Sequence, residues 1–581
     1  MRIALCCVLL LFAIPARAQT PPVFELPEVT IPGRRPQPAA ATPASISVLT
    51  REDLDALGIQ TLAEALQLLP EVFVRTYGGA GGLAEPSIRG FGPGQVLVLL
   101  DGVPLNNVAL GQVDLSTISL NGVQRIEVLR GPFAALAGSG AVGGVINIVT
   151  GAAGSTVTGR YGGAGERRLS MTRDLGAVTL GLDVGGGDGY RLNSDAADVT
   201  LRADLRIHRD LRVSIHHHRA DVGTPGDVGA PTPSDRQSSD RTVFQVQWMN
   251  GDTGRGRAYY TVETLSFLTP FGTSTYRAAL VGSELQRQWP LSSARVLVAG
   301  VEVQGQRLDA EVFGSPIREN AVVGAAYLQY DAALSPHALV SLGLRLDTHS
   351  RYGTALNPRA GISVGLDERT RIRAAVGRTF RGPTFLHLFF PGCSNPGLGP
   401  ESAWAAELGI ERALSGGVIG ATAFAAEAVN LISSGCPPLN VNEASFRGVS
   451  VEGRTRLGVR ALLRLSLTAQ QAIDRATGTT LPRVPALAAN ATLTYRLSDA
   501  SSLAAIVQYV GPRRDVDFSV IPSTMVETPA YVDLGLRYQH RTVGGWTLTV
   551  GIDNALDARY EVVKGFPAPG RRLFVSASGR F

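Results

Sequence analysis

Three adjacent histidines, His216, His217 and His218, have side chains that could bind a metal ion. On a strand, neighbouring side chains face opposite sides, so only His216 and His218 could share one ion. His387, in the run FRGPTFLHLFF, could in the same way bind a haem iron. Neither the pair His216 and His218 nor His387 alone completes a metal centre. We therefore predict no metal site and favour a structural role for these histidines.

Acidic residues offer a second kind of ligand. Asp188, Asp195 and Asp198 could supply oxygen atoms to calcium, but their spacing is not that of an EF-hand loop. Solvated acids in a loop are the simpler interpretation. We therefore expect that no cofactor is required, and calcium bound by these loops is the alternative.

A glycine motif, Gly138-x-Gly140-x-x-Gly143, matches the fingerprint of dinucleotide-binding proteins. That fingerprint needs a strand before it and a helix after it. Residues 133–137 resemble a helical turn, whereas residues 145–149 have the pattern of a strand. The order is reversed, so we predict a backbone turn and no nucleotide site.

The chain offers no paired carboxylates, Ser-His-Asp set or metal cluster at a workable spacing. We therefore predict that it is not an enzyme. The net charge of +5 is small for 581 residues and does not indicate nucleic acid as a partner.

The first 18 residues have the pattern of a secretory signal peptide. Arg2 precedes an apolar run at 3–14, and Ala16-Arg17-Ala18 matches the cleavage pattern, which predicts that the mature chain begins at Gln19. No later stretch reaches the roughly 18–20 apolar residues of a transmembrane helix. If the exported protein lies in a membrane, we expect it to cross as strands.

Two cysteines, Cys393 and Cys436, remain once the predicted signal peptide, which contains the other two, is cleaved off. A pair of cysteines in an exported protein is a disulfide candidate, with two free thiols as the alternative.

Residues 19–43 are rich in proline and alanine and are not expected to build a core. Within them, residues 26–31 form a short segment that could become a strand. An exposed segment of this kind is a candidate for strand addition to a partner protein, and an inert linker is the alternative.

Residues 44–151 predict a compact mixed α/β domain. A strand is expected at 46–49, and Thr50 with Asp53 resembles a capping box that begins a helix ending near Gly58. A second short helix is expected at 61–69, stopped by Pro70. Buried strands are expected at 96–100, 125–129 and 145–149.

Residues 152–581 show apolar and polar residues in alternation, interrupted by turn residues. Trp546, Leu548 and Val550, for example, alternate with polar or small residues, and a Val-Gly-Gly turn at 543–545 joins this run to the one before it. Alternation of this kind, repeated over some 430 residues, is typical of a transmembrane β-barrel, with a soluble β-sandwich as the alternative. The length fits a 22-stranded antiparallel barrel wide enough to hold the preceding domain as a plug.

The mature chain resembles the TonB-dependent outer-membrane receptors. The motifs that carry the resemblance are SIRG at 87–90, LLDGVPLN at 99–106, RIEVLRGP at 125–132 and GSGAVGGVINIVT at 138–150, with NPRAGISV, FRGPTF, NPGLGPE and GIDNALDARY in the barrel. The resemblance implies a monomer in the bacterial outer membrane that imports a small molecule with energy from TonB. It also implies assembly by the barrel-assembly machinery through the C-terminal Phe581 and contact with outer-membrane lipid. The tail segment that matches the TonB box is Leu26, Pro27, Glu28, Val29, Thr30 and Ile31.

The resemblance also implies a latch between plug and barrel. The matching residues are Arg89 and Arg130 in the plug and Glu407 and Glu452 on the barrel wall. A charge inside a filled lumen is costly unless it is paired. We therefore expect these pairs to hold the plug at rest, and a purely structural role is the alternative.

Ligand contacts are expected at the plug loops that face outward in this family. The matching loops are residues 77–83 and 106–112, and the candidate contacts are Tyr77, Gly79, Asn106, Asn107, Leu110 and Gln112. Turn residues without ligand contact are the alternative. Cys393 and Cys436 match extracellular segments, where a disulfide would limit loop motion.

The chain looks most like the cobalamin (vitamin B12) type of receptor. The GGxGxL run before SIRG, the segment DLSTI at 114–118 and the ending FPAPGRRLFV at 566–575 favour this type. Short receptors for ferric siderophores or haem share these features and remain alternatives. A passive porin is a further alternative, although it would not need a TonB box or a plug.

Overall fold

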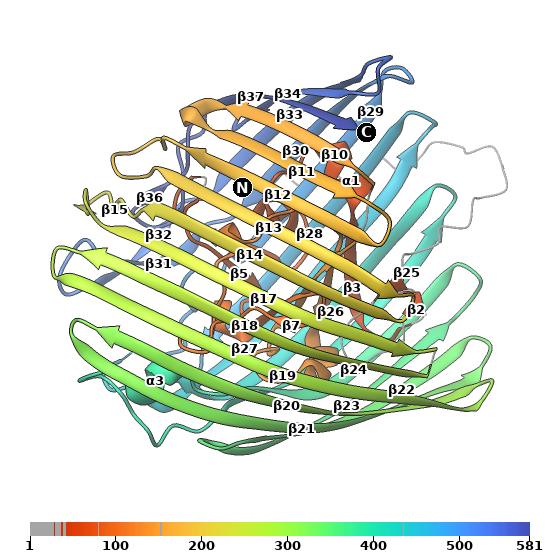
Figure 1. Ribbon diagram of the computed structural model, residues 1–581. Helices are drawn as coiled ribbons and strands as arrows, with labels where there is room; N and C mark the ends of the chain where they lie inside the picture. Colours follow the sequence, from red (N-terminus) through yellow and green to blue (C-terminus); the bar gives the residue numbers. More distant parts are fainter. Residues whose placement is uncertain are drawn as a thin grey trace.

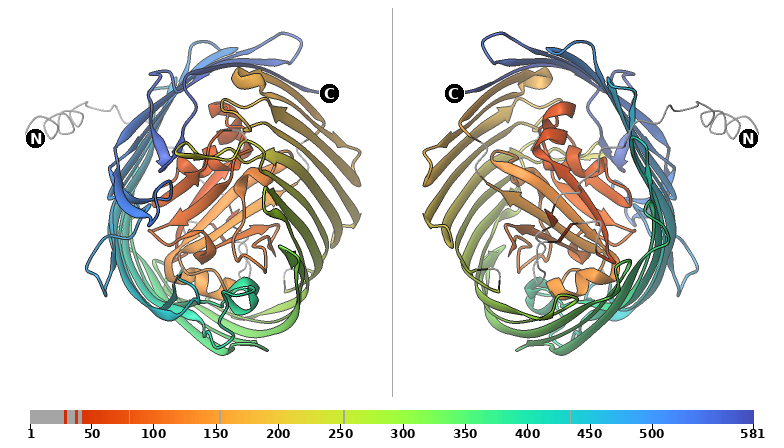
Figure 2. Two further views of the ribbon diagram at one scale, coloured as in Figure 1. Left: turned by 90° about the vertical axis from the view of Figure 1, so that its left-hand side faces the viewer. Right: turned by 90° about the vertical axis from the view of Figure 1, so that its right-hand side faces the viewer.

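The computed structural model describes residues 28–29, 37–38, 42–79, 81–151, 154–251, 253–433 and 435–581. The predicted signal peptide lies outside the described residues. Within this part of the chain, 22 strands form a closed barrel around an N-terminal domain (Figures 1 and 2). The predicted fold, a 22-stranded antiparallel barrel with an α/β plug in its lumen, is confirmed. Among the described residues, no helix is long and apolar enough to cross a membrane.

The plug begins with the elements that the sequence predicts. Thr50 caps α1 (Arg51–Leu57), and Asp53 completes the capping box by accepting a hydrogen bond from the Thr50 amide. Gly58 ends the helix in the left-handed conformation, with φ of 63°. α2 (Leu62–Gln67) follows, capped by Thr61.

A mixed five-stranded sheet forms the centre of the plug, in the order β3-β8-β9-β6-β7. Its strands are β3 (Ser45–Thr50), β6 (Val96–Leu100), β7 (Val103–Pro104), β8 (Val123–Arg130) and β9 (Gly144–Thr150). β6 and β9 run parallel, and the other neighbours run antiparallel. A separate hairpin joins β4 (Val72–Thr76) to β5 (Ala84–Ile88), and the loop between them is the first predicted ligand loop.

Apolar side chains from the helices and the sheet form one buried cluster. Leu62 and Leu66 of α2 pack there with Val96, Ile126 and Ile146 of the sheet, and all five are fully buried. Short 3-10 turns connect the remaining plug segments: η2 (Pro93–Gln95), η3 (Leu115–Thr117) and η4 (Gly131–Ala137).

The barrel closes where its first strand pairs with its last. β10 (Thr156–Gly162) runs antiparallel to β37 (Arg572–Arg580), with Thr156 opposite Arg580 and Gly162 opposite Phe574. The other barrel strands follow in chain order: β11 (Arg167–Asp174), β12 (Val178–Gly187), β13 (Ala196–His208), β14 (Leu211–Gly223), β17 (Arg236–Asn250), β18 (Gly254–Thr269), β19 (Gly272–Ser292), β20 (Arg295–Val312), β21 (Ser315–Ser335), β22 (Ala338–His349), β23 (Gly353–Gly365), β24 (Thr370–Arg381), β25 (Glu401–Leu414), β26 (Gly417–Ile432), β27 (Asn440–Leu457), β28 (Ala461–Asp474), β29 (Leu487–Arg496), β30 (Ser501–Val510), β33 (Tyr531–Arg541) and β34 (Thr547–Asp553).

Long connections lie at one end of the barrel and short turns at the other. Residues 382–400 contain α3 (Phe385–Phe389), residues 511–530 contain β31 (Arg513–Asp517) and β32 (Thr524–Thr528), and residues 554–571 contain β35 (Glu561–Val563) and β36 (Phe566–Pro567). The loop between β14 and β17, at the same end, contains β15 (Gly226–Asp227) and β16 (Ala230–Pro231), and η5 (Gly163–Gly165) joins β10 to β11. Since long loops are extracellular in such barrels, this end faces outward.

Strand length varies strongly around the barrel. β10 and β34 have 7 residues each, whereas β19 and β21 on the far wall have 21 each. Figure 1 shows this asymmetry, with the long strands β19 to β21 in the lower part and the short strands β10, β34 and β37 at the top.

Candidate plug latch and extracellular cavity

Arg89 lies at the interface between the plug and the barrel wall. Its Nε is 2.5 Å from Oε2 of Glu71, and its Nη2 is 2.8 Å from Oε2 of Glu407 on β25. The guanidinium also lies over the ring of Phe424, 4.6 Å from the centroid. Arg89 is 4 % exposed, so these partners take the place of water.

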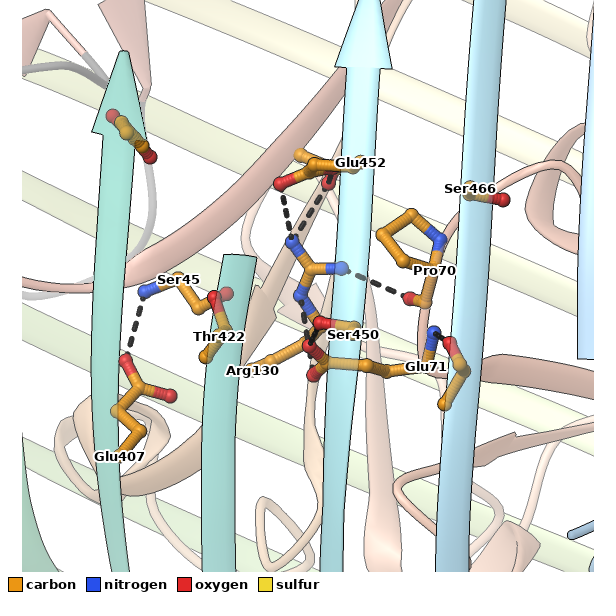
Figure 3. Close-up of polar contacts among 12 residues, drawn as sticks. Ser45, Pro70, Glu71, Arg130, Glu407, Thr422, Ser450, Glu452 and Ser466 are labelled. Carbon is orange, nitrogen blue, oxygen red and sulfur yellow. Dashed lines mark hydrogen bonds and ion pairs between the residues drawn. The ribbon is translucent and has the colours of Figure 1, made fainter. Parts of the chain in front are cut away.

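Arg130, at the end of β8, is fully buried and makes a second set of contacts (Figure 3). It donates hydrogen bonds to the Pro70 carbonyl at 2.9 Å and to Oγ of Ser47 at 2.7 Å. Its Nη2 is 3.7 Å from Oε1 of Glu452 on β27. The Ser47 hydroxyl itself donates to Glu452 at 3.1 Å, so plug and wall are bonded twice at this point.

Glu71 links the two arginines, and sequence reasoning missed it. Besides Arg89, it lies 3.8 Å from Nε of Arg130, and its other oxygen accepts a hydrogen bond from Ser450 on β27. Its backbone amide donates to Oγ1 of Thr468 on β28 at 2.8 Å. Burial opposes ionisation of Glu71, but the charges of Arg89 and Arg130 outweigh it and lower its pKa to about 2.

The backbone at Glu71 adopts the left-handed conformation, with φ of 65°. This conformation is unfavourable for a residue with a Cβ atom and is usually taken by glycine. A glutamate there is compatible with folding because its carboxylate is held by two arginines. The local sequence offers one signal at this residue, its position after Pro70 at the end of a helix. That signal predicts a turn and does not predict an ionic contact.

The structure therefore brings together all four predicted latch residues. Arg89 pairs with Glu407, Arg130 pairs with Glu452, and Glu71 joins both arginines. Glu407 also accepts a hydrogen bond from the Ser45 amide at 3.1 Å (Figure 3). The arrangement can resist plug movement until some force or rearrangement separates the charges.

The first predicted ligand loop lies at the extracellular side of the plug. The Tyr77 hydroxyl donates to Glu85 at 3.1 Å and accepts from Nη1 of Arg483 at 2.8 Å. A Cβ atom on Gly79 would lie 3.0 Å from the ring of Tyr190, in the loop between β12 and β13. Gly79 thus allows the plug to approach an extracellular loop closely.

The second predicted ligand loop is held mainly by its own side chains. Asn106 bonds to the backbone of Val96, Val98 and Gly111. Asn107 donates to Glu263 on β18 at 2.6 Å and accepts from the amides that follow it. These two side chains position the loop, whereas Leu110 packs partly buried and Gln112 contributes its carbonyl to the Asn107 amide.

A cavity of about 280 Å³ lies between the plug and the barrel wall, and residues of the outward loop 554–571 line part of it. Its plug side includes α2 and the first ligand loop, and its wall comes from β10 to β14, β17, β30, β33, β34 and β37. Tyr531 and Tyr560, which line it, stack with ring centroids 4.0 Å apart.

Several arginines that line this cavity lie next to carboxylates of opposite charge. Arg160 pairs with Glu166 at 2.7 Å, and Arg168 pairs with Asp198 at 2.8 Å. Arg572 lies 3.7 Å from Asp553. The cavity therefore has no large excess of positive charge.

Two of the candidate metal ligands, His218 and His387, have other partners. His216 and His218 face a small interior cavity, and Nδ1 of His218 lies 3.0 Å from the Thr200 hydroxyl. His387 lies in α3 rather than at a strand end, where its ring accepts a hydrogen bond from the Thr384 amide. Among the described residues, no three potential ligands lie close enough to hold an ion.

The three acids considered for calcium each face an arginine, and Asp198 lies on β13 rather than in a loop. The pairs are Asp188 with Arg167, Asp195 with Arg236 and Asp198 with Arg168.

A disulfide connects Cys393, in the loop after α3, to Cys436 in the loop between β26 and β27. It ties together two neighbouring extracellular loops, as expected if these loops must keep a fixed arrangement.

Of the predicted TonB box, the structure describes Glu28 and Val29. They form β1 (Glu28–Val29), which pairs with β2 (Gln37–Pro38). Leu26, Pro27, Thr30 and Ile31 lie outside the described residues. At the other end of the chain, the Phe581 amide donates to the Ser155 carbonyl, and Arg173 lies 5.1 Å from its ring.

The fold and the charged interface define a class: a membrane barrel whose lumen holds a plug that is ion-paired to the wall. Two family profiles match the chain, "TonB dependent receptor-like, beta-barrel" over residues 137–555 and "TonB-dependent Receptor Plug Domain" over residues 38–145. The chain belongs to the TonB-dependent receptors of the bacterial outer membrane. The predicted family and location are thus confirmed.

Curated relatives include proteins named Vitamin B12 transporter BtuB. That of Vibrio cholerae serotype O1 (strain O395) is 26% identical over 608 residues, covering 95% of each chain. That of Vibrio vulnificus (strain YJ016) is 25% identical and covers 93% of this chain and 92% of the relative.

Similar solved structures include the siderophore receptor PirA from Acinetobacter baumannii, with a TM-score of 0.78 and 18% identity over 92% of this chain and 98% of that one. The ferric enterobactin receptor PfeA from Pseudomonas aeruginosa has a TM-score of 0.77 and 21% identity over 94% of this chain and all of the other. At these identities the likeness shows the fold alone.

Proposed function

We propose that this receptor imports cobalamin or a related corrinoid across the outer membrane with energy supplied by TonB. The observation that carries the proposal is the similarity to vitamin B12 transporters along 95% of both chains. Such extensive similarity includes both the plug loops and the barrel that would contact a ligand. Binding would occur at the extracellular cavity and the ligand loops, and the proposal includes no catalytic step.

The charges around the cavity support this ligand over a strongly anionic one. A ferric siderophore with a high negative charge would favour a mouth with unpaired cations, because opposite charges steer and hold the ligand. Here Arg160, Arg168 and Arg572 are each matched by a carboxylate. A ferric siderophore is the alternative, and haem follows, since His387 caps a helix.

The plug supports gated import over passive diffusion. The latch joins plug to wall through the buried pair of Arg89 with Glu407 and the partly exposed pair of Arg130 with Glu452, which would be unnecessary in an open porin. We propose that the tail segment 26–31 adds as a strand to TonB, and that the receptor acts as a monomer assembled through Phe581. We also propose that no cofactor is needed, so treatment with EDTA should leave ligand binding unchanged.

Calorimetry on the purified receptor tests the ligand. We expect saturable binding of cyanocobalamin, and weaker or no binding of haem and of a panel of ferric siderophores. Tyr560→Ala, in the cavity lining, should weaken binding, whereas Tyr260→Ala, on the outer face of β18, should not. Saturable binding of a siderophore with no binding of cyanocobalamin would contradict the proposal.

A further inference from the structure

The outer face of β11 carries arginines at both ends of a short apolar stretch. Exposure alternates along the strand, and the outward side chains are Arg167, Leu169, Met171 and Arg173. The residues between them face the lumen, where Arg168 bonds to Asp183. Two apolar side chains therefore separate two outward-facing arginines.

This apolar stretch is too short for the membrane. Six positions separate Arg167 from Arg173, which is about 20 Å along a strand and about 15 Å along the membrane normal at the usual tilt. The apolar band of an outer-membrane barrel is about 25 Å tall. On β19, the outward arginines Arg277 and Arg287 are ten positions apart, which gives about 25 Å by the same geometry.

An apolar groove lies beside this short stretch, across the seam where the barrel closes. Gly159 on β10 pairs with Ala577 on β37, and both positions face outward. No atom lies within 4 Å of the place where a Cβ on Gly159 would be. Larger side chains flank this depression, whose volume is about 890 Å³, and they are Tyr161, Leu169, Val184, Leu548, Val550 and Val575.

We propose that this seam groove binds an acyl chain of a phosphorylated glycolipid from the extracellular leaflet, with Arg167 at its phosphate. The groove lies on the lipid-facing wall, and its flanking side chains are about half exposed or more, as Tyr161 (64 %) and Val575 (52 %) show. Where the apolar stretch is short, the bilayer must thin or its lipids must reorient, and a groove accommodates a reoriented chain.

Charge fixes the leaflet and the class of lipid. Arg167 lies at the extracellular end of β11, and its side chain is 69 % exposed. Its nearest carboxylate, Asp188, is 3.8 Å away and 74 % exposed, and exposed pairs of this kind contribute little. A phosphate can therefore replace Asp188 as the partner of the guanidinium, with shorter and stronger hydrogen bonds.

Native mass spectrometry of the full-length receptor tests the proposal. The protein would be exchanged into detergent with hexa-acylated bisphosphorylated lipid A or with phosphatidylglycerol, and retained lipid would be counted. We expect one retained lipid A in the wild type. Gly159→Leu, which fills the groove, and Arg167→Gln, which removes the cation, should each lower retention about fivefold or more.

Matched controls lie on the far wall. Gly324 on β21 also faces outward with free space around it, and Arg277 on β19 is an outward arginine. Gly324→Leu and Arg277→Gln should retain lipid A as the wild type does. Equal retention by all variants, or equal retention of phosphatidylglycerol, would overturn the proposal.

Arg167→Gln keeps the test valid if Gly159→Leu fails to fold. The change is on an exposed side chain, and its folding can be checked by heat-modifiable migration on a gel. Binding of cyanocobalamin is expected to be unchanged in Gly159→Leu, because Gly159 does not line the ligand cavity, so a failure of the lipid site is distinguishable from a failure of the proposed ligand.

Discussion

Nη2 of Arg89 on the plug lies 2.8 Å from Oε2 of Glu407 on the barrel wall, and both side chains are almost fully buried. Buried charges such as these are stable only when they are paired, because water cannot solvate them. Moving the plug away from the wall would leave one charge unpaired or expose both to water. We therefore expect the pair to oppose opening of the plug until solvent reaches it.

Replacing the latch arginines should loosen the plug. Arg89→Ala leaves the buried carboxylate of Glu407 without its cation, which costs about 3–5 kcal/mol. Arg130→Ala should cost less, because Glu71 keeps Arg89 as its partner. The plug should then open at lower urea concentration, measured as the onset of conductance in planar bilayers. Arg209→Ala is the control, since Arg209 is 86 % exposed and contacts Asp210 only at the surface. Conductance and ligand uptake equal to those of the control would contradict the latch.

Acid should weaken the same cluster. The pKa of Glu71 is about 2 in the folded plug, below the roughly 4.3 of an unfolded glutamate. A lowered pKa stabilises the folded state above the unfolded value, and this stabilisation is lost as the pH falls from about 4 towards 2. Plug opening in urea, followed between pH 6 and 3, should shift to lower urea concentration.

Glu71→Gln isolates this contribution. The variant cannot titrate at this position, so its urea midpoint should be lower than that of the wild type at pH 6 and should change less between pH 6 and 3. An unchanged pH dependence in the variant would show that other carboxylates carry the effect.

Much of this fold could be predicted because its signals are local. The capping box at Thr50, the turn at Gly58 and the alternation that ends in β34 depend on neighbouring residues, and the structure contains each of them. The length over which the alternating pattern repeats then allowed the size of the barrel to be predicted. These features do not require knowledge of which distant segments touch.

Glu71 could not be predicted because its role depends on contacts distant in the chain. Its partners Ser450 and Thr468 lie nearly 400 positions away. The same reason explains Asn106: its side chain had the chemistry of a ligand contact, but the structure places it on the backbone of Val96 and Val98. Whether Asn106, Asn107 and their neighbours touch a ligand stays a prediction.

The tail segment should be needed for transport and not for binding. Proline at a strand position removes a backbone donor, so Val29→Pro should prevent strand addition to a partner. We expect uptake of the bound ligand by whole cells to be lost, with the binding constant of the purified receptor unchanged. Ala40→Pro, later in the tail, is the control and should transport normally. Normal uptake by Val29→Pro would contradict a TonB box at this position.

The disulfide should stabilise the extracellular loops. It closes a segment with a separation of 43 residues, for which a contribution of about 2–4 kcal/mol is typical. Reduction, or the double change Cys393→Ser and Cys436→Ser, should lower the denaturant midpoint of the loop region, read by protease sensitivity. Reductant should have no further effect on the double variant. Equal protease resistance with and without the bond would contradict this role.

Asp114 should respond to pH in the sense opposite to Glu71. It lines the extracellular cavity and accepts hydrogen bonds from the amides of Ala84 and Ser116. Burial raises its pKa to about 6, and those hydrogen bonds only partly oppose the effect. A raised pKa means that the folded plug binds the proton more tightly than the unfolded chain, so stability is gained as the pH falls from 7 towards 4 and is lost as it rises through 6. The free energy of unfolding should rise by about 1–2 kcal/mol between pH 7.5 and 4.5.

Asp114→Asn, which cannot titrate, should remove this rise, and the difference between wild-type and variant urea midpoints should grow steadily over that interval. A difference independent of pH would mean that Asp114 is ionised throughout, held by partners other than the two amides.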